Sequence, residues 1–234
     1  MPASGNHLLG RREFIAGAAF AAGALALPQA AMAQLDNPVQ RLLMLSAQRA
    51  LAQLMMPNGF WNSRVARFGL PTLFKKTAAN AAGPLGQDSF REQLQRRLNN
   101  LAESGARGAA PIVNEVARKV VVPNPAAILS KQGSAATSLL RLEAGSELVN
   151  AMRPALEQTL VAAQDPIVSQ AVTALAGVSF ADVAHAVALA ADNGIWYEIG
   201  MVEAEIRANP ALANDPALAA ALRPAYPPTT SPTP

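Results

Sequence analysis

The chain has 234 residues, of which 51% are hydrophobic and 15% charged, and it contains no cysteine. A chain of this length can bury a sufficient apolar core without disulfides or a structural metal. The absence of cysteine excludes a disulfide framework, a thiol nucleophile and thiolate zinc sites. Because His7 and His185 are its only histidines, a multi-histidine metal site is also excluded, and we expect neither a metal nor a cofactor.

Residues 1–33 are typical of an export signal. The pair Arg11-Arg12 precedes an apolar run from Phe14 to Leu27, and Ala31-Met32-Ala33 forms a small-x-small cleavage site before Gln34. The run is shorter than the about 20 residues that a membrane span needs. The arginine pair resembles a twin-arginine signal, with Gly10 where that signal usually has Ser or Thr. We therefore expect a periplasmic or otherwise exported mature chain; an ordinary secretory signal is the alternative to the twin-arginine type.

Helix starts recur along the mature chain as Asn or Asp followed by proline. The Asx side chain can accept N–H groups of the first turn, and proline lacks only an N–H that the first helical position does not need. The pairs are Asn37-Pro38, Asn124-Pro125, Asp165-Pro166, Asn209-Pro210 and Asp215-Pro216. Ser89 and Glu92 have the spacing of a capping box. Since the run Val120-Val121-Val122 is too short to indicate a strand, the sequence predicts an all-α fold.

The apolar periodicity predicts a single-domain helical bundle over residues 34–222 with long kinked helices. Pro111 lies inside one predicted helix, and Gly145 and Pro154 lie inside another, so we expect kinks there. The predicted helices span 38–55, 89–119, 125–131, 134–163, 166–176 and 179–208. Residues 223–234 are rich in proline and predict a disordered tail.

The start of the helix predicted at 134–163 is the first candidate ligand site. Ser134 follows a glycine and is predicted to cap the helix through its hydroxyl. Thr137 and Arg141 share one helix face a turn further on. Together with the free N–H groups of the first turn, these residues could bind a carboxylate or a phosphate. In the structural alternative Ser134 caps, Thr137 assists, and Arg141 pairs with an acid from another helix such as the last one.

Phe60 and Trp61 are the second candidate ligand site. They directly follow the turn Asn58-Gly59. In one interpretation they plug a hydrophobic loop onto the bundle. In the other they rim a ligand cleft or lie at a membrane interface.

The remaining polar residues are predicted to have structural roles. Glu198, Glu203 and Glu205 are predicted to form a solvated face, with Glu203 paired to Arg207 four residues later. His185 is predicted to be a packed or surface histidine without a partner. Because the chain contains no nucleophile elbow, phosphate loop or dinucleotide motif, no residue is singled out as catalytic.

Charge is unevenly distributed along the mature chain. Residues 34–153 contain 15 Lys and Arg against 7 Asp and Glu, whereas residues 154–234 contain 2 against 8. One interpretation is that the two parts pack together and partly neutralise each other. The other is a bipolar surface whose basic side meets anionic lipid or nucleic acid. Aromatic residues make up only 5% of the chain, which disfavours nucleic acid because stacking side chains are scarce.

The order of several short motifs resembles the bacterial family catalogued as domain of unknown function 4197, over residues 38–211. The motifs include Gly59-Phe60-Trp61-Asn62, Leu98-Asn99 with Glu103, Ser134-Ala135-Ala136-Thr137 with Arg141, Arg153-Pro154 and Gly194-Ile195-Trp196-Tyr197. The family has threonine where this chain has Ser134. The resemblance implies an exported helical protein and brings no activity with it.

These observations predict a non-catalytic exported protein that binds a partner, or an apolar or anionic ligand, in the cell envelope. One alternative is an enzyme that uses carboxylates and Arg141 in a polar cleft. The other is a structural envelope protein without a small ligand. An enclosed apolar cavity would favour ligand binding, a polar cleft would favour catalysis, and a filled bundle would favour the structural role. We expect no transmembrane helix in the mature chain.

Overall fold

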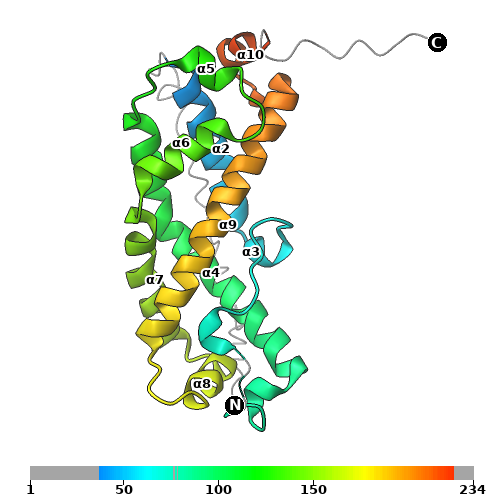
Figure 1. The fold of residues 1–234 in the computed structure, drawn as a ribbon, viewed down its shortest axis with the longest axis vertical. Coiled ribbons are helices and arrows are strands. Elements are labelled where there is room, and N and C mark those ends of the chain that lie inside the picture. Colours follow the sequence, from blue (N-terminus) through cyan, green and yellow to red (C-terminus); the bar gives the residue numbers. More distant parts are fainter. Residues whose placement is uncertain (1–36, 76, 78, 224–234) are drawn as a thin grey trace, which may run out of the picture.

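The computed structural model describes residues 37–75, 77 and 79–223 (Figure 1). Every regular element in this part is a helix, so the all-α prediction is confirmed. The predicted signal at 1–33 and the predicted tail beyond Arg223 lie outside the described residues. The α-helices are α2 (Pro38–Leu54), α3 (Gly59–Asn62), α4 (Asp88–Lys119), α5 (Pro125–Leu129), α6 (Ala135–Ala144), α7 (Glu147–Ala163), α8 (Pro166–Thr173), α9 (Phe180–Ala208) and α10 (Pro216–Leu222), and the 3-10 helices are η1 (Thr72–Phe74), η2 (Pro84–Gly86) and η3 (Pro210–Ala213).

Four of the five Asx-Pro pairs begin α-helices, as predicted. The side chains of Asn37, Asn124, Asp165 and Asp215 accept first-turn N–H groups of α2, α5, α8 and α10 at 2.9–3.1 Å. Asn209 instead precedes η3 and makes no such bond. The Asx side chain and the proline affect only the first turn of the helix, so these helix starts can be predicted from the local sequence.

The capping box predicted at Ser89 is wrong. Helix α4 already begins at Asp88, which places Ser89 inside the first turn. A capping box does form at the start of α9, where Ser179 Oγ accepts from Asp182 N at 3.3 Å and Asp182 Oδ2 accepts from Ser179 N at 2.8 Å. The long helix that carries most of the candidate site residues therefore has a well-defined start.

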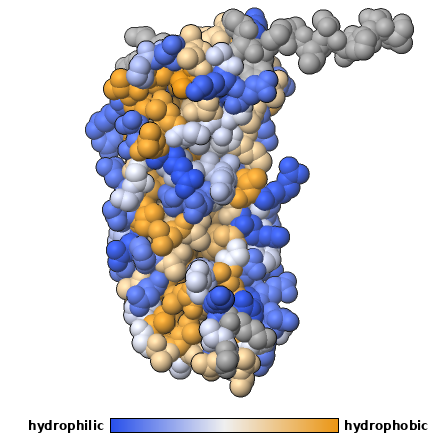
Figure 2. All heavy atoms as spheres, viewed as in Figure 1, coloured by the Kyte–Doolittle hydropathy of each residue, from blue (hydrophilic) through white to orange (hydrophobic). Residues whose placement is uncertain are grey.

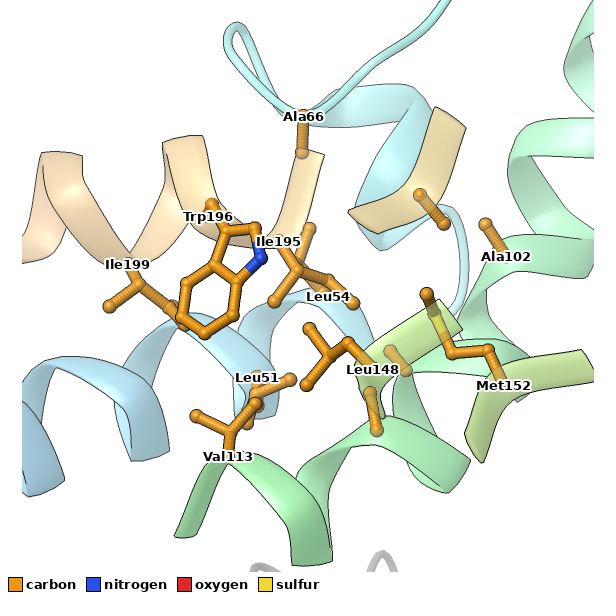
Figure 3. Packing of buried hydrophobic residues seen from close by; sticks show 14 of the residues in the cluster. Leu51, Leu54, Ala66, Ala102, Val113, Leu148, Met152, Ile195, Trp196 and Ile199 are labelled. Carbon is orange, nitrogen blue, oxygen red and sulfur yellow. The ribbon is translucent and has the colours of Figure 1, made fainter. Parts of the chain in front are cut away.

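Helices α2, α4, α7 and α9 pack along one another around the core. In Figure 1, α9 crosses the bundle diagonally, with α5 and α10 at one end and α8 at the other. Figure 3 shows Leu51 and Leu54 of α2, Val113 of α4, Leu148 of α7 and Ile199 of α9 converging, and all five are at most 1% exposed. Burying each such side chain contributes about 1.5–3 kcal/mol, so this convergence holds the long helices together.

Residues 134–163 form two helices, where the sequence predicted a single kinked one. The break falls at Gly145, whose φ of 52° and ψ of −126° lie in a backbone region that side-chain-bearing residues avoid. Pro154 lies inside α7 and Pro111 inside α4, and neither proline ends its helix. Leu142, on α6 just before the break, is 77% exposed.

The break can be tested by replacing Gly145 with alanine. Because a Cβ is strained at this φ and ψ, we expect Gly145→Ala to lower the free energy of unfolding by about 1–3 kcal/mol in urea titrations. Gly69→Ala is the matched control, since a Cβ there meets no atom within 4 Å and its φ is not positive. Equal stability of the Gly145→Ala variant and the unmutated protein would contradict the assignment of the break to Gly145.

Candidate functional site

The N-terminus of α6 is held by a buried ion pair on α9. Glu203 Oε1 accepts from Ala136 N at 3.0 Å, and Glu203 Oε2 accepts from both Thr137 N and Thr137 Oγ1 at 2.6 Å. Arg207 lies one turn along α9 and donates from Nε to Glu203 Oε1 at 2.7 Å. The side chains of Glu203 and Arg207 are 0% and 1% exposed. A carboxylate from one helix therefore caps another, where the positive end of the helix dipole favours it.

Arg207 extends this network to the segment that precedes α6. Its Nη1 donates to the carbonyl oxygens of Leu129 at 3.0 Å and Lys131 at 3.2 Å. A buried guanidinium is tolerated when a carboxylate and backbone oxygens receive its protons. The pair therefore fixes the end of α5, the connection after it and the start of α6 against α9.

Two of the three glutamates predicted on a solvated face are buried. Glu198 is 5% exposed and Glu203 is 0% exposed, so the prediction is wrong for both, while Glu205 is exposed as predicted. The predicted pairing of Glu203 with Arg207 is confirmed. The spacing of four residues predicts the contact within α9, but it carries no information about which other element covers that face.

Ser134 occupies the cap position of α6, but its hydroxyl makes no capping hydrogen bond, so that prediction is wrong. Glu203 accepts the N–H groups of Ala136 and Thr137 in its place. Ser134 packs against α9 at Gly200, where an added Cβ would lie 2.9 Å from the Ser134 Cβ. Gly200 is thus the residue that lets the start of α6 approach α9 closely.

Arg141 pairs with the last long helix, as the structural alternative predicted. Its Nη2 donates to Asn193 Oδ1 at 2.6 Å and lies 3.5 Å from Asp192 Oδ2. Asp192 Oδ1 accepts from Trp196 Nε1 at 2.9 Å. Burial raises the pKa of Asp192, although the Trp196 hydrogen bond and the Arg141 charge act in the opposite direction. This cluster ties α6 to α9 a turn beyond the Glu203 cap.

A groove of about 440 Å³ lies over the C-terminal half of α9 and is open to solvent. Trp196 is 2% exposed and Tyr197 is 58% exposed, so one aromatic is packed into the core while its neighbour projects outward. Figure 3 shows the Trp196 ring among the core side chains. The lining residues are Val65, Gly133, Ser134, Trp196, Tyr197, Gly200, Met201 and Ala204, and we call this surface the α9 groove. Of the first candidate site, the structure places Ser134 in the groove, but not Thr137 or Arg141.

The wall of the α9 groove that carries Val65 is fixed by polar side chains of the long helices. Ser63 Oγ donates to Glu198 Oε2 at 2.6 Å, which joins this wall to α9. On the α4 side, Asn99 Oδ1 accepts from Phe68 N at 3.1 Å and Asn99 Nδ2 donates to Phe68 O at 2.9 Å. Segment 63–68 has no regular structure of its own, and the Asn99 bonds satisfy both backbone groups of Phe68. The groove therefore has two positioned walls, this segment and the start of α6.

The neighbours Phe60 and Trp61 have different environments. Phe60 is fully buried and meets Phe68 edge to face, with ring centroids 6.3 Å apart, as the plugging interpretation predicts. Trp61 is partly exposed, and the guanidinium carbons of Arg67 and Arg96 lie 5.0 and 5.7 Å from its ring centroid. Neither aromatic lines the α9 groove.

Glu103 of α4 faces the start of α3. Burial raises the pKa of its carboxyl, and this rise is opposed by the backbone of Asn58, the charge of Arg107 and the backbone of Gly59. Like Glu203, it brings a carboxylate from a long helix to the beginning of a short one. The sequence marked Glu103 only through the family resemblance, because proximity to a residue of another helix has no local signature.

The unequal charges of the two chain segments meet in ion pairs between helices. Arg41 pairs with Asp215 at 2.9 Å, Arg97 with Asp165 at 3.3 Å and Arg141 with Asp192 at 3.5 Å. Each pair joins a basic residue before position 154 to an acid after it. This arrangement agrees with the interpretation in which the two segments partly neutralise each other.

The part of the chain that the structure describes contains no cluster of three or more His, Asp or Glu side chains able to hold a metal ion. Among these same residues, no helix combines the length and apolar character that crossing a membrane requires. His185 is exposed on α9. The lining of the α9 groove is mostly apolar and includes Ser134 and Tyr197.

Comparison with known proteins identifies a family, but that family has no described activity. The model of a family described as "Protein of unknown function (DUF4197)" matches residues 29–221. No curated protein and no solved structure matches the chain.

Removing one partner of the buried Glu203–Arg207 pair should destabilise the fold strongly, whereas removing the Ser134 hydroxyl should change stability little. Glu203→Ala should lower the free energy of unfolding by about 3–5 kcal/mol, because it leaves Arg207 buried without its partner. Glu203→Leu combined with Arg207→Met removes both charges and should recover most of that loss. Ser134→Ala should change stability by less than about 0.5 kcal/mol. Urea unfolding measures all three, and a loss of about 1 kcal/mol or more for Ser134→Ala would contradict capping by Glu203.

Proposed function

Because the chain belongs to the family described as a protein of unknown function (DUF4197), which supplies no activity, we propose a function from the site itself. The protein is a non-catalytic binding protein of the cell envelope. It holds an apolar ligand, or an apolar side chain of a partner, in the α9 groove. The groove is the observation that carries this proposal, because its volume of about 440 Å³ falls in the range of small-molecule sites and its lining is mostly apolar.

The lining also supports a ligand that is apolar with one polar group. Tyr197 and Met201 supply adaptable apolar contact area, and the Ser134 hydroxyl makes no hydrogen bond within the part of the chain that the structure describes. An anionic ligand at Ser134, Thr137 and Arg141 has less support. Glu203 already accepts the N–H groups that would receive an anion, and Arg141 faces Asp192.

The alternatives have weaker support from the same geometry. An enzyme that uses carboxylates with Arg141 needs them to converge in a cleft, whereas Glu203 is bonded through both oxygens to α6 and lies apart from the Asp192 pair of Arg141. A purely structural envelope protein needs no concave apolar surface, and the α9 groove gives this chain one.

The export that this function requires is predicted from Arg11-Arg12 and Ala31-Met32-Ala33. Chain extracted from the cell envelope should have Gln34 as its first residue by N-terminal sequencing. Replacing both arginines with lysine should leave the uncleaved chain in the cytoplasm. Finding Met1 at the N-terminus of the envelope-extracted protein would overturn the proposed location.

Binding in the α9 groove can be measured with the neutral fluorescent probe 1-N-phenylnaphthylamine. Tyr197→Ala should weaken its affinity about tenfold, because contact with a half-exposed aromatic ring is worth about 1–2 kcal/mol. Ala204→Phe, which fills the groove, should weaken it further. Leu142→Ala is the matched control, since Leu142 is 77% exposed and lies outside the groove. Equal affinity of all four proteins would contradict the groove as the binding site.

A further inference from the structure

Two exposed arginines, Arg67 and Arg96, lie against the ring of Trp61. Arg67 lies in the segment that follows α3, and Arg96 projects from α4. The guanidinium carbons of Arg67 and Arg96 lie 5.0 and 5.7 Å from the Trp61 ring centroid, so one ring gathers two cations from different elements. We call Trp61, Arg67 and Arg96 the Trp61 face.

No acid of the described residues forms an ion pair with the arginines of the Trp61 face. In contrast, Arg41, Arg97 and Arg141 all pair with acids that follow position 154. A guanidinium that stacks on an aromatic ring keeps its N–H edges free for oxygen acceptors. Arg67 and Arg96 are thus oriented by Trp61 and remain able to bind phosphate oxygens.

The scaffold beneath the Trp61 face is rigid. Phe60, the residue before Trp61, is fully buried against Phe68. Phe68 in turn is held on both its backbone N–H and its carbonyl oxygen by Asn99, and Gln95 donates to the same carbonyl at 3.0 Å. A partner therefore meets arginines whose backbone is already ordered, which lowers the entropic cost of binding.

The chemistry of the face distinguishes between anionic partners. Nucleic acid binding without sequence preference uses aromatic rings with open faces on which bases stack, and two guanidinium groups already occupy the π surface of Trp61. A partly exposed tryptophan flanked by arginines is instead typical of the interface between water and lipid, where the ring lies at headgroup depth and the arginines reach phosphates. Figure 2 shows mostly hydrophilic residues along the edge that Figure 1 assigns to the segment after α3 and the first half of α4.

We propose that the Trp61 face docks the protein on the surface of an anionic phospholipid bilayer. The contact is peripheral: the arginines bind lipid phosphates, and the exposed edge of Trp61 enters the headgroup layer. Docking through this face does not depend on the α9 groove having a ligand, so neither proposal fails with the other.

The test is co-sedimentation with vesicles that mix phosphatidylcholine with anionic phosphatidylglycerol, compared with vesicles of phosphatidylcholine alone. The chain is used as isolated from cells, so that its N-terminus is the same in every variant. Arg67→Gln combined with Arg96→Gln should lower the partition coefficient about thirtyfold, since each arginine near an anionic surface contributes about 1 kcal/mol. Arg118→Gln combined with Arg223→Gln removes the same charge at the end of the bundle where α5 and α10 lie, and should lower it less than threefold.

Two further measurements distinguish binding through the Trp61 face from binding driven by net charge, and from a loss of binding caused by misfolding. Arg67→Lys combined with Arg96→Lys keeps the charge and should retain most of the binding, with an unchanged melting temperature. Because Trp196 is 2% exposed, a blue shift of tryptophan emission on adding anionic vesicles reports Trp61.

Equal binding to pure phosphatidylcholine would overturn the proposal, as would an equal loss in the Arg118/Arg223 variant. Equally tight binding of single-stranded DNA through the same arginines would reassign the face to nucleic acid.

Discussion

The buried Glu203–Arg207 pair on α9 is the interaction that holds the end of α5 and the start of α6 against the long helices. Neither charge has access to solvent, so each depends on the other and on the backbone groups of residues 129–137 that hydrogen-bond to it. Moving α6 away from α9 would leave the buried Glu203 carboxylate without the hydrogen bonds from Ala136 and Thr137. The start of α6 is therefore fixed to α9, and with it one wall of the α9 groove.

The same arrangement recurs where the chain leaves regular structure between α3 and α4. Arg91 donates from Nη1 to the carbonyl oxygens of Phe74 at 2.9 Å and Leu85 at 3.4 Å, and Asn99 holds both backbone groups of Phe68. Buried backbone groups outside helices need partners, and α4 provides them here through its side chains, as α9 does for the start of α6. This connection is held without cysteine or strand pairing.

Segment 63–68 links the two proposed binding surfaces. Val65 lines the α9 groove, while Arg67, two residues later, belongs to the Trp61 face. An apolar groove and a positively charged surface thus share one rigid segment anchored to α9 through Ser63 and Glu198. A protein docked on lipid through the Trp61 face would hold the α9 groove close to the bilayer, where apolar ligands partition.

The sequence by itself determined the helices and most of their starts, because capping by Asn37 or Asp165 and apolar periodicity act over one or two turns. It also located the Glu203–Arg207 contact, which lies within one turn of α9. Only the tertiary structure decided that Glu203 is buried and caps α6 in place of Ser134, and that Val65 and Tyr197 line one groove. Residues that are distant in the chain supply these partners, and the burial of a charge depends on what covers it, which no local pattern encodes.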